Sequence, residues 1–546
     1  MKPSLILNGR SEILLATVIF SLLTACVSTE NLQRKMASGP PEYPKESLIP
    51  RSEIKPDAPP YRAPSEGPLR LSIRDAILSA FENNQALVLE KFNPSIQQTV
   101  EDQELAVFDP VLEASVSAGR AKERRLTTSG TQTGDSTTDT FDGAISLSRF
   151  FPTGTTVDLE GTTSTTDSSL SPDPFSQSRL GLTVTQALLQ GYGTEFNLAS
   201  LRRAEIDTEI SLYELRGFSE TLLSEVETAY WDYALAQRQI EIVEESLKVV
   251  RQQLAETEEM IAVGTMAESE LAAVQAEVAA QEQALIDARS AAETARLRLL
   301  RLINPPGTPL YEREVELLYD PTIPELKLDD VKDHVALSLR MLPLVNQTKL
   351  GIQQNDLDIV RTRNGLLPRL DLFISLGKSG YADSFSGSVS DITNENSYDV
   401  LAGVNLRYPI FNRDAEAQHR RSILLREQAE EALKNVVQLV ELDVRSAYIE
   451  VRRSKEQIAA SAATRRFEEE KLRTETEKFK VGRSTSILVA QAQRDVLAAR
   501  ISEVEAIVNY LRALISFYRV EGTLLARRGI AAPGNEPVTL YNKSVY

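Results

Sequence analysis

The feature that most constrains the fold of this 546-residue chain is an internal repeat at one fixed separation. The repeated pairs are Ala229-Tyr230 with Ala447-Tyr448, Val263-Gly264 with Val481-Gly482, and Gln275 with Gln493, all matched without a gap. A repeat of this kind means that one structural unit is present twice. We place the two units at residues 69–305 and 329–524, joined by a linker at 306–328 and followed by a C-terminal tail at 525–546.

The second half of each repeat has the pattern of two long helices that form a hairpin. No proline interrupts the chain from about Thr194 to Ile261, and apolar residues recur there every seven positions, at Ile240, Leu247, Leu254 and Ile261. After Gly264 a return arm carries Leu271, Val278 and Leu285 at the same spacing. The second copy runs from about Asp414 to Val481 and from Ile487 to Tyr518. At about 1.5 Å per residue, the longer arms would extend on the order of 100 Å. An ordinary coiled-coil spacer has the same pattern.

The first half of each repeat changes from a helical pattern to strands. The helices expected near 72–106 and 329–364 end before Pro110 and Pro368, and proline disfavours helix in the residue that precedes it. Apolar and polar residues then alternate, with the apolar set at Leu112, Ala114, Val116 and Ala118 in one repeat and at Leu370, Leu372, Ile374 and Leu376 in the other. The segments have the length of tilted membrane strands, about 9 to 11 residues, although a soluble β-sandwich would alternate in the same way. We expect four strands in the first repeat and two in the second, with loops such as 378–397 between them.

The beginning of the chain predicts export and a lipid anchor. Lys2 and Arg10 precede an apolar run from Ile13 to Ala25, a pattern that favours a signal peptide at 1–25. Leu23-Thr24-Ala25-Cys26 resembles the lipobox of bacterial lipoproteins, which implies that Cys26, the only cysteine, carries acyl chains such as palmitate. Val27 in place of an aspartate resembles the lipoproteins of the outer membrane. Residues 26–68 are polar and dense in proline, which predicts an extended tether.

Composition argues against several classes of function. The 60 basic residues against 78 acidic ones give a net charge of -18, which is unfavourable for a nucleic-acid partner. The two histidines, His334 and His419, lie far apart in sequence, so we expect neither to be a metal ligand. With one cysteine expected to be lipidated, the sequence predicts no enzyme, no cofactor and no metal site.

Helix, strands and long helical hairpin, repeated behind a lipobox, resemble the outer-membrane efflux protein family, often called TolC-like. The resemblance covers residues from about 69 to 524. Its more specific marks are Pro110 and Pro368, the strand-to-helix turns at 186–191 and 408–412, and the hairpin tips at 263–265 and 481–483. The order and the doubling of these features carry more weight than any one of them.

The resemblance implies an α+β fold in which long α-helical coiled-coil hairpins form a tunnel (an α-barrel) and transmembrane antiparallel strands complete a trimeric β-barrel. It implies a homotrimer in the outer membrane of a Gram-negative cell, extending into the periplasm. Such a protein is the exit duct of a tripartite efflux or type I secretion system, and its partners are a periplasmic adaptor (membrane fusion) protein, an inner-membrane transporter and outer-membrane lipid.

Two questions stay open at this point. The family usually has four strands per subunit, so six would imply either a wider barrel or a hairpin outside it. The alternative function is a periplasmic coiled-coil structural or adaptor lipoprotein without a pore.

The resemblance also implies where the functional residues lie. The hairpin tips would dock the adaptor, through Val263, Gly264, Thr265, Val481, Gly482 and Arg483. Many members narrow the tunnel with aspartates just after the second tip, where this chain has Leu488 and Gln491. An acidic constriction would therefore come from Glu270 and Glu268 of the first tip, with Gln491 beside them. Glycine is also the ordinary residue of a tight turn, and a glutamate on a helix is most often simply solvated.

Overall fold

The structure is a computed structural model that describes residues 68–126, 132–169, 171, 173–305, 309–318 and 328–540. The expected signal peptide, Cys26 and all but the last residue of the proline-rich tether lie outside these residues, as does most of the expected linker at 306–328. The chain divides into two units, and the description that follows concerns the second, Lys55–Tyr546.

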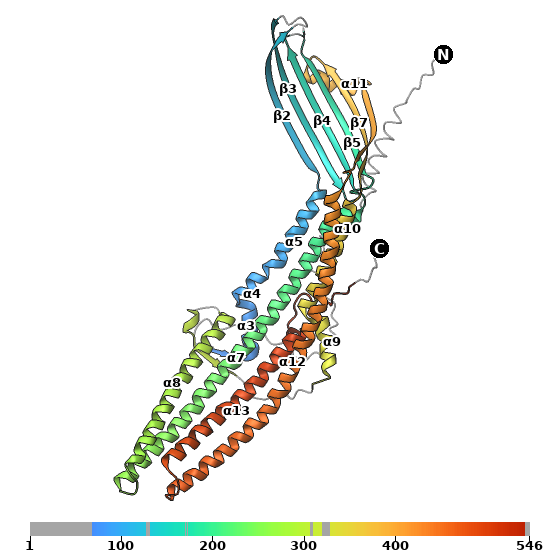
Figure 1. Cartoon of the computed structure of the whole chain (residues 1–546). Helices are drawn as coiled ribbons and strands as arrows, with labels where there is room; N and C mark the ends of the chain where they lie inside the picture. The colour runs from blue at the N-terminus through green and yellow to red at the C-terminus, as the bar shows by residue number, and fades with distance from the viewer. Residues whose placement is uncertain are drawn as a thin grey trace. The chain divides into compact units, whose positions relative to one another are not determined.

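A six-stranded antiparallel sheet contains all the strands that the alternating segments predict (Figure 1). Its order is β2-β3-β4-β5-β7-β8, with bounds Val111–Leu126, Gln132–Phe151, Thr155–Ser168, Phe175–Ala187, Arg369–Ala382 and Tyr398–Arg407. The prediction of four strands in the first repeat and two in the second is therefore confirmed. A tight turn at Gly154, whose φ of 86° suits glycine, joins β3 directly to β4. Within the described residues, the edge strands β2 and β8 pair with one neighbour each.

The prediction of a plain loop at 378–397 is wrong. Strand β7 extends to Ala382, and the helix α11 (Phe385–Asn394) packs on β7 and β5 before β8 begins. Ser388 of α11 is buried and its hydroxyl lies 2.8 Å from that of Ser178. A Cβ atom at Gly380 would lie 2.1 Å from the Ser388 carbonyl oxygen, so only glycine permits this close approach. Small polar residues thus let a short helix lie on the sheet.

The expected helical hairpins are confirmed. The first consists of α7 (Ala199–Ala262) and α8 (Ser269–Ile303), and the second of α12 (Arg413–Lys480) and α13 (Ser486–Glu521). With 64 residues, α7 is about 96 Å long at 1.5 Å per residue. Of its heptad positions, Val243, Leu247 and Val250 are buried, whereas Leu254 stays partly exposed. Among the described residues no helix has the length and apolar character of a membrane span.

The helices expected as single pieces at 72–106 and 329–364 are each interrupted. The first consists of α3 (Ile73–Asn83), α4 (Gln85–Glu90), α5 (Phe92–Leu105) and a short 3-10 turn. It breaks at Asn84, whose side chain accepts hydrogen bonds from the backbone N–H groups of Ala86 and Leu87 and so starts a new helix. The second breaks into α9 (Val331–Met341) and α10 (Pro343–Gly365), because Pro343 cannot continue the helix before it.

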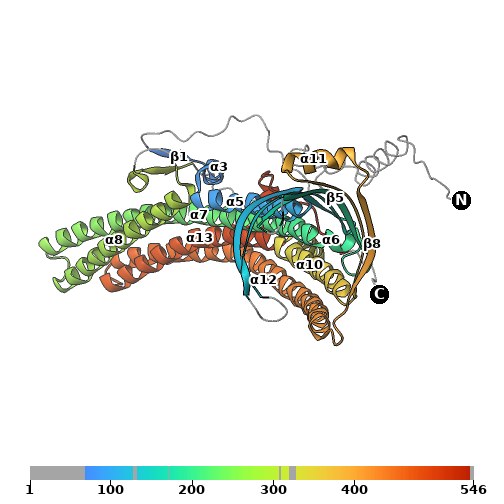
Figure 2. The same ribbon diagram turned by 90° about the horizontal axis from the view of Figure 1, so that it is seen from above.

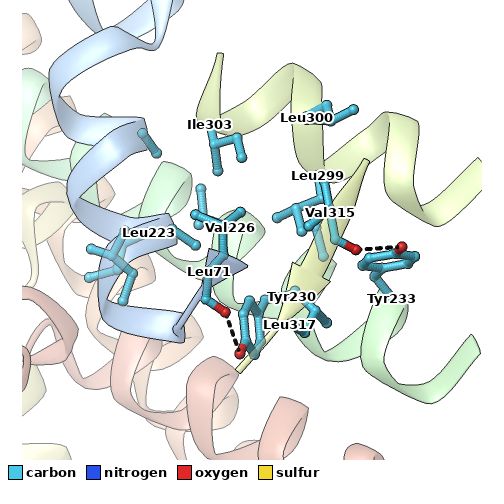
Figure 3. Close-up of a cluster of buried hydrophobic side chains, with 14 of the residues drawn as sticks. Leu71, Leu223, Val226, Tyr230, Tyr233, Leu299, Leu300, Ile303, Val315 and Leu317 are labelled. Carbon is cyan, nitrogen blue, oxygen red and sulfur yellow. Dashed lines mark hydrogen bonds between the residues drawn. The ribbon is translucent and has the colours of Figure 1, made fainter. Parts of the chain in front are cut away.

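A compact apolar core lies where the two repeats meet, midway along α7. It includes a two-stranded parallel sheet, β1 (Leu69–Leu71) with β6 (Val315–Leu317), that the alternation did not predict. The Tyr230 hydroxyl donates to the carbonyl oxygens of Leu71 and Leu318, and the Tyr233 hydroxyl donates to that of Val315 (Figure 3). Two tyrosines of α7 therefore hold the small sheet on the helical body.

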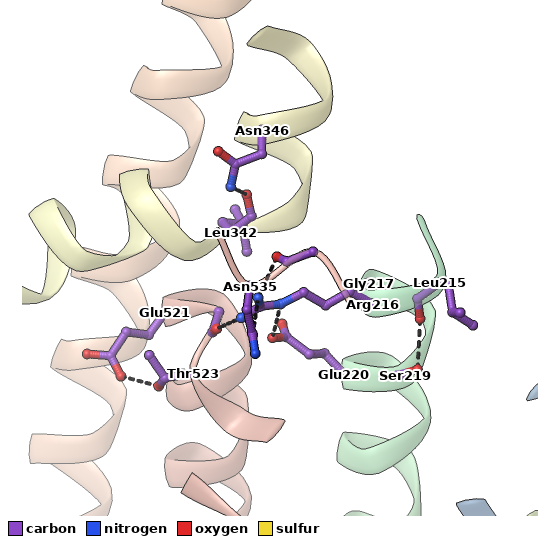
Figure 4. A network of polar contacts seen from close by, with 12 residues as sticks. Leu215, Arg216, Gly217, Ser219, Glu220, Leu342, Asn346, Glu521, Thr523 and Asn535 are labelled. Atoms are coloured by element: carbon purple, nitrogen blue, oxygen red, sulfur yellow. Dashed lines mark hydrogen bonds and ion pairs between the residues drawn. The ribbon is translucent and has the colours of Figure 1, made fainter. Parts of the chain in front are cut away.

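The C-terminal segment follows the short helix α14 (Leu524–Arg527) and packs on α7 and α10. Arg216 of α7 is 1% exposed, and its guanidinium donates to the carbonyl oxygens of Gly534 and Gly522 at 2.6 and 3.0 Å (Figure 4). Asn346 of α10 accepts from the backbone N–H of Val538. Residues up to Val538 are thus held on the helical body by specific hydrogen bonds.

Candidate functional site at the hairpin tips

Both hairpins reverse direction through turns of the same geometry. The N–H groups of Thr265 and Arg483 donate to the carbonyls of Met260 and Lys478, at 3.0 and 2.8 Å, which closes the end of each long helix. Gly264 and Gly482 have φ of 75° and 73°, and no atom lies within 4 Å of where a Cβ would be. Glycine is therefore required by the backbone conformation and not by crowding. Val263 and Val481 are 71% and 68% exposed, so each tip presents one apolar side chain.

A hydrogen-bonded contact joins the two tips. One carboxylate oxygen of Glu270, in the first turn of α8, accepts from the backbone N–H of Ser486 at 3.0 Å and from its hydroxyl. Ser486 is the first residue of α13 and is fully buried. Thr485, at the N-cap of α13, makes no side-chain cap of its own. A glutamate of one hairpin therefore caps a helix of the other.

The other predicted aperture residues lie apart from this contact. Glu268 and Gln491 are exposed, and Leu488 is 48% exposed. The structure brings Glu270 together with Ser486 and does not bring Glu268 and Gln491 into hydrogen bonding with each other. That Glu270 and Glu268 narrow an aperture stays a prediction, as does docking through the tip residues.

Above the tips, polar pairs connect the hairpins along α13. Arg494 contacts Glu277 at 2.6 Å, Arg500 contacts Glu245 at 3.5 Å, and Gln239 donates to Glu505 at 3.2 Å. Glu277 is almost fully buried and also accepts from Gln281 at 2.9 Å. Because a buried carboxylate is costly without partners, separating the hairpins would leave Glu277 poorly satisfied. These pairs, which we call the hairpin seam, favour a joined state of the two hairpins.

Neither the pairs of the hairpin seam nor the contact of Glu270 with Ser486 was predicted from the sequence. In the repeat, Glu270 aligns with Leu488, and Ser486 aligns with Glu268, at the same separation that relates Val263 to Val481. A polar residue that replaces an apolar one between two copies of a repeat is a signal that the copies contact different neighbours there. The sequence alone names the position but not the partner.

Charge at the second tip is paired within its own hairpin. Glu475 of α12 contacts Lys478 and accepts from the hydroxyl of Ser484, at 2.6 and 2.9 Å. These hydrogen bonds, first that of Lys478, lower the pKa of the Glu475 carboxyl. Glu475 is therefore ionised at neutral pH and holds the loop that leads into α13.

At the other end of the helices, one face of the sheet is polar. Arg179 on β5 reaches across β7 to Asp399 on β8 at 2.7 Å, and its guanidinium passes over Gly377. A Cβ at Gly377 would lie 2.5 Å from that guanidinium, so glycine leaves room for the pair.

Among the described residues, no group of three or more His, Cys, Asp or Glu side chains is placed to hold a metal ion.

Comparison with protein families gives a direct match. The family model for the outer membrane efflux protein matches residues 146–305 and 337–523, which is more than half of the chain. The protease secretion protein PrtF of Dickeya chrysanthemi is 25% identical over 324 residues. That match covers 57% of this chain and 66% of PrtF, slightly less than two thirds of the relative.

Solved structures show the same fold at low sequence identity. The outer-membrane channel OprN matches with a TM-score of 0.62 and 17% identity, over 82% of this chain and 89% of that one. The CmeC outer membrane channel of Campylobacter jejuni matches with a TM-score of 0.61 and 15% identity, over 83% and 86% of the two chains. The doubled helix, strand and hairpin order, the tip geometry and the family match agree, and the chain belongs to the outer membrane efflux protein family.

Proposed function

We propose that this protein is the outer-membrane exit duct of an efflux or type I secretion system in a Gram-negative cell. The observation that carries the proposal is the continuity between sheet and hairpins. Strand β5 leads through α6 (Thr194–Asn197) into α7, and β8 leads into α12, so the sheet continues directly into the helical body (Figure 1). Membership of the family supports the same assignment.

The duct is a homotrimer. Successive strands of the sheet are antiparallel, so β2 and β8 at its edges also run in opposite directions. A second copy can therefore place its β2 beside β8 of the first and continue the antiparallel pattern, and three copies close a ring. Unpaired strand edges are not tolerated in lipid, because their N–H and C=O groups would have no partners.

The hairpin tips are the docking sites for a periplasmic adaptor, which links the duct to an inner-membrane transporter. Val263 and Val481 are exposed beside rigid turns, and apolar side chains on rigid turns suit helical partners. PrtF is a protein of protease secretion, and its similarity favours polypeptide export. Small-molecule efflux is the other candidate. The chain supplies a passive conduit, and the transporter supplies the energy.

The experiment is conductance in a planar bilayer with the full-length protein. An exit duct inserts from one side and gives discrete single-channel steps, which increase when Glu270→Ala weakens the contact between the tips. A trimer that never conducts, with native tips or with the Glu270→Ala substitution, would overturn the proposal and favour the alternative of a periplasmic structural or adaptor lipoprotein.

A further inference from the structure

The two faces of the six-stranded sheet differ in polarity. Ser178, Leu180 and Leu182 lie on one face of β5, and Arg179 lies on the other, because side chains alternate along a strand. Since Ser178 contacts α11, the face with the leucines is the one that α11 covers. Figure 2 shows the sheet curved, with α11 beyond its convex side. The apolar face is therefore convex and the polar face is concave, as expected if lipid lies outside and water inside.

Every strand carries apolar residues on the convex face, and together they form a band. We call this set the outer band, and it includes the two middle strands β3 and β4. Its members are Leu112, Ala114, Val116 and Ala118 on β2; Phe141, Ile145 and Leu147 on β3; Val157 and Leu159 on β4; Leu180, Leu182 and Val184 on β5; Leu370, Leu372, Ile374 and Leu376 on β7; and Val400, Ala402, Val404 and Leu406 on β8. Ile145 and Leu159 are 54% and 43% exposed in the single chain.

The outer band runs obliquely across the strands, as strand tilt in a membrane requires. Its upper end is Arg120 on β2 and the interfacial aromatic Tyr398 on β8. Through the five ladders Tyr398 is in register with Ala114, six residues below Arg120. Six residues rise about 20 Å and five strand spacings measure about 24 Å, which gives a tilt of about 40°. Membrane strands tilt by about 35 to 45°.

The height of the outer band also fits a membrane. On β3, charged residues bound the band at Arg149 below and Asp139 above, ten positions apart. Ten residues at about 3.4 Å each, tilted by about 40°, span about 26 Å, and the apolar belt of outer-membrane proteins is about 25 Å tall. On β5 the band ends at Leu180, directly below Ser178, where α11 begins to cover the sheet. The tilt of the band and its height at that tilt are therefore both those of an outer-membrane strand wall.

The hairpin of β3 and β4 has the same features as the other four strands: a place inside the sheet, an apolar convex face and a polar concave face. It pairs with β2 on one side and with β5 on the other over most of their lengths, so β2 and β5 do not meet. Its concave face is polar, with Ser146 and Glu160 directly paired in the ladder. A hairpin outside the ring would leave β2 and β5 side by side, and they are not.

We propose that the β3–β4 hairpin lies in lipid as part of the transmembrane wall, so that each subunit contributes six strands. The inference rests on the proposed function, because it takes the sheet to be the membrane part of a trimeric duct. Three subunits then close a ring of eighteen strands instead of the twelve that four per subunit would give. Because the diameter of a barrel grows roughly linearly with strand number, the outer mouth is about half again as wide.

The test is cysteine labelling of the full-length protein reconstituted in liposomes, with a membrane-impermeant maleimide. Ile145→Cys and Leu159→Cys lie in the outer band of the hairpin, and Ser146→Cys is the matched control on the opposite face. Ile374→Cys and Ser375→Cys form the same pair on β7. We expect Ser146→Cys to label about tenfold faster or more than Ile145→Cys and Leu159→Cys, and Ser375→Cys to exceed Ile374→Cys by a similar factor, after subtraction of the unsubstituted chain.

The outcomes separate this inference from the proposed function. If Ile145→Cys and Leu159→Cys label as fast as Ser146→Cys while Ile374→Cys is protected, the hairpin is outside the wall and only this inference is overturned. If Ile374→Cys also labels rapidly, the sheet does not face lipid and the proposed function fails with it. Electron microscopy of the unsubstituted trimer gives an independent count, and a ring of twelve strands would overturn the inference without any substitution.

Discussion

Glu270 does at the hairpin tips what a serine or aspartate usually does at the start of a helix. Its carboxylate accepts from the first N–H of α13, although it belongs to the other hairpin. Negative charge is favourable there, because the N–H groups of the first turn have no partners within the helix. The contact stabilises α13 only while the two hairpins stay together.

Removing this cap should loosen the second tip. We expect Glu270→Ala to cost about 0.5 to 2 kcal/mol locally, as for other helix caps. Amide hydrogen exchange of residues 485–490 should then accelerate by a factor of up to about 30, because 2 kcal/mol corresponds to that factor. Glu270→Gln keeps one acceptor oxygen and should have a smaller effect.

The matched control is Glu268→Ala, two residues away, where the native side chain makes no cap hydrogen bond. Exchange at residues 485–490 should be the same in this variant as in the native protein. Equal exchange in the Glu270→Ala and Glu268→Ala variants would show that the cap contributes nothing to the closed tips.

For single residues, the sequence predicted the backbone conformation of the turns but not which side chains contact each other. The turns at Gly264 and Gly482 have the positive φ that their glycines suggested. The contact of Glu270 with Ser486 and that of Arg494 with Glu277 were not predicted. Periodicity assigns a residue to one side of a helix, but which residue of the second hairpin lies opposite depends on how the hairpins are offset along their axes. No local pattern encodes that offset.

Among the elements, length decided what the sequence could predict. Strands and hairpin helices with several periods of alternation or heptads were found, whereas β1 and β6 have three residues each, too few to show a period. The helix α11 was missed because its one buried residue, Ser388, is small and polar. The helix breaks occur at a capping residue, Asn84, and at a proline, Pro343. Because the helical pattern of apolar residues continues across both positions, the sequence predicted one helix in each case.

The C-terminal segment depends on a buried charged group in α7. Arg216 directs its shorter hydrogen bonds to the segment, at 2.6 Å to both Gly534 and Asn535, and contacts Glu220 only at 3.4 Å. Burial therefore raises the pKa of Glu220 to about 7, although Arg216 opposes the shift. The Glu220 carboxyl therefore binds its proton more tightly in the folded protein than in the unfolded chain.

This preference predicts a pH dependence of stability. A pKa raised on folding contributes stability that is complete below about pH 4.5, the ordinary value, and is lost as the pH rises through about 7. The loss is at most about 3 kcal/mol per subunit, from 1.36 kcal/mol per pKa unit. In Glu220→Gln this part of the pH dependence should disappear. Thermal unfolding of the full-length protein in detergent from pH 4.5 to 8 measures it.

The control on the same helix is Glu225→Gln, at an exposed position. It should unfold with the same pH dependence as the native protein. A Glu220→Gln variant whose melting temperature still falls between pH 4.5 and 8 as in the native protein would contradict the assignment of the effect to this carboxyl group.

At the scale of the whole molecule, the six strands of one chain form an open sheet with two edge strands. Val116 on the edge strand β2 is 74% exposed, and Val404 on the opposite edge strand β8 is 61% exposed. Both edges offer unpaired backbone groups beside apolar side chains, which supports the proposal that neighbouring copies and lipid cover them. The sequence predicted the number of strands, but the ladders were needed to show that all six belong to one continuous sheet.

Lipidation of Cys26 is the prediction that belongs to the whole protein. Labelled palmitate fed to cells should enter the native protein and not a Cys26→Ala variant, whose signal peptide should also remain uncleaved, because processing before a lipobox cysteine requires the lipid. Ser28→Ala, two residues later, should incorporate label normally. Incorporation into the Cys26→Ala variant would show that the lipid is attached elsewhere.

The turn at Gly154 joins β3 to β4 without an intervening helix, so two of the six strands have no helical continuation below them. Six strands spaced by about 4.8 Å and tilted by about 40° occupy about 38 Å of circumference, and four helices packed about 8 to 10 Å apart occupy about 32 to 40 Å. In the proposed ring, the six strands of each subunit therefore fit above its four helices α5, α7, α10 and α12 without a gap in the wall.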